Sequence, residues 1–182
     1  MKRLIWDESG GPLVELALAM PLLTAILLGA IGLGQLAMGA INVSNAAKAA
    51  VQYAAQDSGT AVDTATMLSV AKADIGNTIG QTGTLDMPKP LGLPSVASCV
   101  STGTSPKSYS CSYCQCSSPN ASVAPFACST ADPNTACGVN STSQLEQVIV
   151  VSTHINMRPV AAIPGLPVSF DMYGNATEKR LQ

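Results

Sequence analysis

The longest hydrophobic segment of the chain lies near its N-terminus. Residues 16–41 contain no charged side chain, and Thr24 and Gln35 are the only clearly polar residues among these 26 positions. As an α-helix, such a segment rises about 39 Å, which exceeds the roughly 30 Å hydrocarbon core of a bilayer. Buried helices of soluble domains seldom combine this length with such uniform apolarity. The segment therefore predicts a transmembrane helix.

A cleaved secretory signal is the alternative interpretation. Signal peptides have an apolar core of about 7–15 residues and small residues at the cleavage site. Small residues are frequent at the end of residues 16–41, but this segment is about twice as long. Lys2 and Arg3 precede it, and only Lys48 follows closely. The positive-inside rule therefore places the N-terminus in the cytoplasm and the rest of the chain outside it.

The alanine-rich residues 42–56 are expected to continue the first helix out of the membrane, and Ser58 and Gly59 to end it. A second helix is predicted over residues 60–79, with Thr60 or Asp63 as its N-cap. Glycines are expected to weaken and then close its C-terminal end; they are Gly76, Gly80 and Gly83. Apolar residues at spacings of three and four define its buried face: Leu68, Ala71, Ile75 and Ile79.

Alternating patterns later in the chain predict strands. Residues 107–116 form a short candidate. Residues 146–157 form the clearest one, with Val148 and Val150 on one face and Ile149 and Val151 on the other. A third candidate, residues 166–173, follows a Pro-Gly turn at residues 164–165. The predicted fold is α+β, with a long transmembrane helix followed by a small extracytoplasmic head. In this head a helix packs on an antiparallel sheet, beside a Cys-rich loop region.

The six cysteines all lie after residue 95: Cys99, Cys111, Cys114, Cys116, Cys128 and Cys137. An even number of cysteines in an oxidising compartment predicts disulfides, with fifteen possible connectivities. On a strand, Cys114 and Cys116 share one face and Cys111 lies on the other, so their partners should come from the remaining three. The alternatives are a zinc site, or a redox-active pair at Cys111 and Cys114.

Composition excludes further classes of function. The net charge is −2, charged residues are 11%, and there is no basic stripe, so we expect no nucleic-acid partner. His154, the single histidine, lies far in sequence from the cysteines, and no nucleophile–base constellation is recognisable. We therefore expect neither an enzyme nor a cofactor or metal. The enzymatic alternative is a membrane-tethered thiol oxidoreductase that uses Cys111 or Cys114.

The residues around the start of the apolar helix resemble a known processing site. Gly10 is followed by Gly11 and, four residues later, by Glu15. This spacing resembles a prepilin peptidase site, in which cleavage after glycine leaves glutamate as the fifth residue of the mature chain. Residues 15–29, with Pro21, together with the alanine-rich residues 45–55, resemble the start of TadE-like proteins, the pseudopilins of tight-adherence (Flp) pilus systems.

This resemblance implies a minor pseudopilin in the bacterial inner membrane that takes part in building Flp pili for adhesion. Its expected partners are the prepilin peptidase, other pseudopilins or pilins, and the pilus assembly platform. The expected domains are a cytoplasmic leader (1–10), a transmembrane and extended helix (11–57) and a disulfide-stapled head (58–182). The second hypothesis is an uncleaved, membrane-tethered adhesin or sensor head.

Small residues recur along the apolar helix at a spacing of four. In lipid this pattern lets helices approach closely, because packing drives their association there. It is also a general feature of membrane helices, which are rich in Gly and Ala. The candidate helix-packing residues are Ala17, Pro21, Ala25, Gly29, Ala30 and Gly34.

Overall fold

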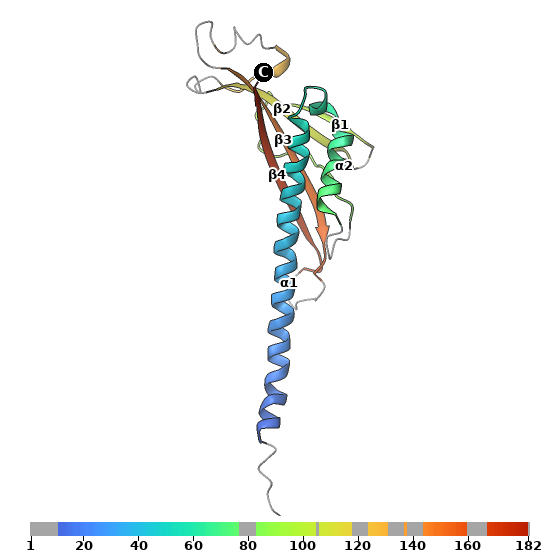
Figure 1. Cartoon of the computed structure of the whole chain (residues 1–182), viewed down its shortest axis with the longest axis vertical. Coiled ribbons are helices and arrows are strands. Elements are labelled where there is room, and N and C mark those ends of the chain that lie inside the picture. Colours follow the sequence, from blue (N-terminus) through green and yellow to red (C-terminus); the bar gives the residue numbers. More distant parts are fainter. Residues whose placement is uncertain are drawn as a thin grey trace, which may run out of the picture.

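The structure is a computed structural model that describes residues 11–76, 83–104, 106–117, 124–130, 137, 144–159 and 167–181. The proposed leader with Gly10, the residues Ile79 and Gly80, and the Pro-Gly turn at 164–165 lie outside these ranges. Figure 1 shows one long helix, α1, whose upper half packs on a small head and whose lower half projects away from it. This arrangement confirms the predicted α+β class.

Helix α1 spans Gly11–Ala54, 44 residues, and continues through Pro21. Its end is two residues earlier than expected. The Thr60 hydroxyl lies 3.2 Å from the Ala54 carbonyl oxygen and donates toward it, which helps to satisfy one of the free carbonyl groups at the helix end. The chain then turns through a short 3₁₀ helix, η2 (Thr60–Val62), that leads into the second helix.

Helix α2 spans Thr64–Ile75. Its N-cap is Asp63, one of the two residues predicted for this position. The Asp63 carboxylate accepts the Thr66 backbone N–H at 3.1 Å. The helix ends at Ile75, earlier than predicted, and residues 77–79 lie outside the described ranges. Gly76 adopts a positive φ of 55°, a conformation that glycine accommodates readily, and it terminates the helix there.

Four antiparallel strands form one sheet in the order β1-β2-β3-β4. They are β1 (Ser98–Thr102), β2 (Ser108–Cys116), β3 (Leu145–Met157) and β4 (Phe170–Leu181). Strands β2 and β3 match the predictions within one residue at each end. The last strand was predicted wrongly, as residues 166–173, because Gly174 was taken as its end. In the structure β4 runs through Gly174 and pairs along the whole of β3 from Glu146 to Met157.

Helices α1 and α2 cover one face of the sheet, where the main core lies (Figure 1). Ile149, Val151, Ile155 and Met157 of β3 belong to this core, and the predicted alternation placed Ile149 and Val151 on one face of the strand. The C-terminal half of α1 contributes mainly small side chains, so that its backbone lies close to the strands. The core residues of this half are Val43, Ala46, Ala47, Ala50, Val51 and Ala54.

Three disulfides join the six cysteines. The pairs are Cys99–Cys111, Cys114–Cys128 and Cys116–Cys137. Each cysteine of β2 therefore pairs with one from outside the strand, as the strand geometry predicted. Cys114, Cys116 and Cys137 form a second small core with Leu145 and Phe126, close to the 3₁₀ helix η3 (Cys128–Thr130). All six thiols are joined in these bonds, and Cys111 and Cys114 are each joined to another cysteine rather than to one another.

Candidate functional site

The N-terminal half of α1 presents an apolar surface that the head does not cover. Fourteen of the large side chains between Leu13 and Ile41 are exposed by 47% or more, reaching 76% at Leu18, whereas Leu36 is partly buried. Leu13–Ala54 is long and apolar enough to cross a membrane, and it is the one such helix in the described part of the chain. An apolar helix left this exposed requires a lipid or protein environment, so the geometry supports single-pass anchoring.

The two described residues of the predicted processing site lie at the start of this helix. Gly11 is its first residue, and Glu15 is exposed one turn later on the same face. Gly10 lies outside the described ranges. The proposed scissile bond therefore directly precedes, in sequence, the first described residue of α1, and cleavage itself stays a prediction.

The predicted helix-packing residues all lie on this projecting half. A side chain at Gly29 or Gly34 would meet nothing within 4 Å, so both positions are open to a neighbouring helix. Ala17, Pro21, Ala25 and Ala30 are exposed as well. The surface is therefore available for packing, and its use stays a prediction.

The contact between α1 and the head involves two glycines that the sequence analysis did not single out. A Cβ at Gly39 would lie 2.8 Å from the Met157 methyl carbon and 3.1 Å from the Met172 sulfur. A Cβ at Gly174 would lie 2.7 Å from the Val43 carbonyl carbon. The close approach of helix and strand depends on the absence of a side chain at Gly174, where the atoms in the way are backbone, whereas at Gly39 the flexible ends of two methionines could move aside.

Hydrogen bonds reinforce this contact. The buried Thr153 hydroxyl donates to the Val43 carbonyl oxygen at 2.8 Å, next to Gly174. At the far end of α1, the Tyr53 hydroxyl lies 3.5 Å from the Asp63 carboxylate that caps α2. The C-terminal half of α1 is therefore an integral part of the head, while the N-terminal half remains outside it.

The outer face of the sheet, which the helices do not cover, carries a polar cluster around His154. Its Nδ1 lies 2.7 Å from Asp86 Oδ1, and its Nε2 lies 3.2 Å from Asp171 Oδ1. The Asn156 amide donates to the same Asp171 oxygen at 2.9 Å. These contacts with Asn156 and then His154 hold the pKa of the Asp171 carboxyl below its usual value. None of these partners of His154 was predicted from the sequence, in which His154 was noted only for its distance from the cysteines.

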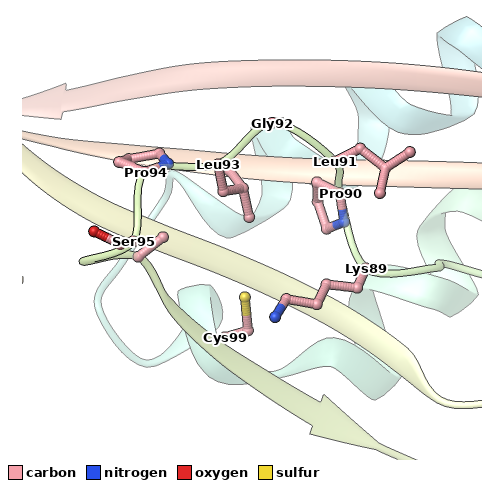
Figure 2. A pocket seen from close by; sticks show the side chains of 9 residues that line it. Lys89, Pro90, Leu91, Gly92, Leu93, Pro94, Ser95 and Cys99 are labelled. Atoms are coloured by element: carbon pink, nitrogen blue, oxygen red, sulfur yellow. The ribbon is translucent and has the colours of Figure 1, made fainter.

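Hollows lie along the segment of residues 88–95, and the two described next share Lys89 and Leu91 in their linings. Figure 2 shows the first, a hollow of about 380 Å³ between residues 89–95 and Cys99, in which Lys89 extends toward Cys99. The second, about 390 Å³, lies between Pro88, Lys89 and Leu91 on one side and the sheet on the other. Its sheet side consists of Ser152, Tyr173 and Asn175.

Comparison with known proteins identifies the N-terminal part of the chain. Residues 13–58 match the model of the family described as TadE-like protein. No curated protein and no solved structure matches the chain. The matched segment covers the exposed half of α1, its contact with the head and the turn after it. The family resemblance inferred from Glu15, Pro21 and the alanine-rich continuation is thereby confirmed over this segment.

Proposed function

We propose that this chain, TadE-like in its N-terminal helix, is a minor pseudopilin that takes part in the biogenesis of Flp-type (tight-adherence) pili for surface adhesion. The family match supports a pilus-related role. The pseudopilin assignment and the role in adhesion are the specific content of the proposal.

The division of α1 into two halves is the observation that carries the proposal. Its C-terminal half supplies core residues to the head, whereas its N-terminal half leaves an apolar surface uncovered. One continuous helix therefore links the head to an apolar environment. Such a subunit can lie in a membrane before assembly and pack its helix against other helices afterwards, since both environments satisfy the same apolar surface.

The proposal includes cleavage of this chain at the predicted processing site. A prepilin peptidase would cleave the Gly10–Gly11 peptide bond at the cytoplasmic face and free the amino group of Gly11. This ammonium would lie one helical turn from Glu15. In an assembly, Glu15 of one subunit would neutralise the N-terminus of its neighbour, because opposite charges attract strongly in a low dielectric. Pro12, the second residue after the proposed cleavage point, is unfavourable for a peptidase that binds its substrate in an extended conformation, because proline restricts the backbone and has no N–H to donate.

The proposed orientation places the head in the periplasm of a bacterium and the N-terminus in the cytoplasm. Lys2 and Arg3 favour this direction of insertion. The three disulfides favour it too, because the periplasm is oxidising and the cytoplasm is not. The proposed partners are the prepilin peptidase, other pseudopilins or pilins and the assembly platform. The proposal includes no catalytic step for this chain.

Complementation of a deletion strain tests the pseudopilin role. The wild-type chain should restore surface pili, counted by electron microscopy, and adhesion to a solid surface. Glu15→Ala should reduce both strongly, while Glu178→Ala, an exposed carboxylate on β4, should restore both fully. Full piliation with Glu15→Ala would remove the assembly role of Glu15. Normal piliation without the chain would contradict the proposed function and favour a tethered adhesin.

A further inference from the structure

We propose that the groove beside Tyr173, on the outer face of the sheet, binds a neutral carbohydrate chain. The groove is the second hollow described above, bordered by Pro88, Lys89, Leu91, Ser152, Tyr173 and Asn175. The inference gives the adhesion part of the proposed function a class of ligand, and in that sense rests on it. Its test, however, uses the isolated protein and does not depend on pilus assembly.

An exposed and firmly held aromatic ring is the first observation. Tyr173 is 63% exposed although it lies within β4 and pairs with His154 of β3. Its ring packs against the imidazole of His154, with ring centroids 4.6 Å apart and planes at 32°. An aromatic face attracts positively polarised C–H groups because of its quadrupole. A ring fixed in place and open to solvent can therefore stack against the C–H face of a sugar.

His154 positions this ring. Both of its nitrogens are engaged, Nδ1 with Asp86 and Nε2 with Asp171, which fixes the plane of the imidazole. The backbone supports the same arrangement, because Asp86 and His154 exchange two N–H···O bonds of 3.1 and 2.9 Å. Segments 68 residues apart therefore hold His154 in place beneath Tyr173 before any ligand arrives. Binding then need not pay the entropic cost of ordering these side chains.

Hydrogen-bonding groups next to the ring match hydroxyl groups. The Ser152 hydroxyl donates to the Asn175 side-chain oxygen, which fixes that amide and leaves its NH₂ group to donate to a ligand. The Asp171 carboxylate, 59% exposed, lies on the same face of β4 as Tyr173 and provides acceptors. Sugar hydroxyls both donate and accept, so they can pair with amide, hydroxyl and carboxylate groups together.

The charge of the surroundings selects against an anionic ligand. Asp86 and Asp171 flank His154 beside the groove, and these two carboxylates outnumber Lys89, the one cationic side chain in its described lining. A purely apolar ligand is disfavoured as well, since it would strip water from the exposed Asn175 amide without replacing its hydrogen bonds. The volume of about 390 Å³ lies within the range of small-molecule sites.

Binding of soluble oligosaccharides to the full chain tests the proposal. The protein is held under non-reducing conditions in a detergent without a sugar headgroup, because a glycosidic detergent would compete. The probes are chitotriose, cellotriose and maltotriose as neutral chains, and trigalacturonate as the acidic comparison, titrated by isothermal calorimetry. At least one neutral probe should bind, and trigalacturonate should bind more weakly than that probe.

Matched variants locate the site. Tyr173→Ala should weaken the binding of that probe by about tenfold or more, whereas Tyr173→Phe, which keeps the ring, should bind within a few-fold of wild type. Thr177→Ala, an exposed change on the same face outside the groove, should leave affinity unchanged. If Tyr173→Ala disturbs the fold, Asn175→Ala is the second test, and it should also weaken the binding of that probe. Absence of binding to every neutral probe, or equal affinity in Tyr173→Ala and Tyr173→Phe, would overturn the proposal. Neither result would bear on the role in pilus assembly.

Discussion

Substitution of Gly174 by alanine tests whether close contact between α1 and β4 holds the head on its helix. A Cβ at this position would lie 2.7 Å from the Val43 carbonyl carbon and 2.8 Å from the Ser44 nitrogen. Ordinary van der Waals contact begins near 3.4 Å, so the Val43 carbonyl carbon must move away by roughly 0.7 Å, and the Val43 oxygen, which is nearer still, by more. The atoms in the way are backbone, and no side-chain rotation relieves the clash.

The expected loss of stability follows from this geometry. Overpacking of a well-packed contact usually costs about 1–3 kcal/mol. Separation would also stretch the 2.8 Å hydrogen bond from Thr153 to the Val43 carbonyl, which lies beside the new methyl group. For a domain of this size, such a loss lowers Tm by several degrees.

The assay is thermal unfolding of the full chain in detergent under non-reducing conditions, followed by near-ultraviolet circular dichroism. Gly59→Ala is the matched control, because Gly59 has an ordinary helical φ of −67° and nothing lies within 4 Å of its Cβ position. The control should keep or slightly raise Tm, since alanine reduces the entropy of the unfolded chain. Equal Tm values for Gly174→Ala and Gly59→Ala would refute the reasoning.

Three further results are expected. Peptide mapping without reduction should recover Cys99–Cys111, Cys114–Cys128 and Cys116–Cys137, and any other pairing would contradict the topology. The double change of Cys116 and Cys137 to Ser should cost about 3 kcal/mol in denaturant unfolding, because it opens a loop of 21 residues, and an unchanged midpoint would count against this. Contacts with Thr66 lower the pKa of Asp63, so its contribution to stability is present above the unfolded value near 3.8 and disappears as pH falls through the lower folded value. Asp63→Asn should therefore flatten the decrease in Tm below pH 4, and an unchanged slope would exclude this cause.

Local signals accounted for most of the architecture. The apolar length of residues 16–41, the cap at Asp63 and the alternation along β3 each act within a few residues, so the sequence alone carries them. The rule that Cys111, Cys114 and Cys116 would find partners elsewhere also followed from local strand geometry. The choice among the possible connectivities did not, because it depends on how loops return to β2.

The features that the sequence did not reveal depend on contacts between distant segments. Gly174 was taken as the end of a strand, as an isolated glycine often is. In the structure it is the point where α1 crosses β4, and only the position of Val43 explains it. The same holds for His154, whose partner Asp86 is 68 residues away. A signal for the helix–head contact was present, however, in the alanine spacing of residues 46–54.

The N-terminus and intact mass of the protein extracted from a bacterial membrane test the central claim most directly. We expect a first residue of Gly11 and a mass six hydrogens below that of the fully reduced chain, as three disulfides require. This result would establish prepilin processing and an oxidised, extracytoplasmic head. A chain that retains Met1 when prepilin peptidase is present would contradict the pseudopilin account, and the anchored head would then have to act as a tethered binding module.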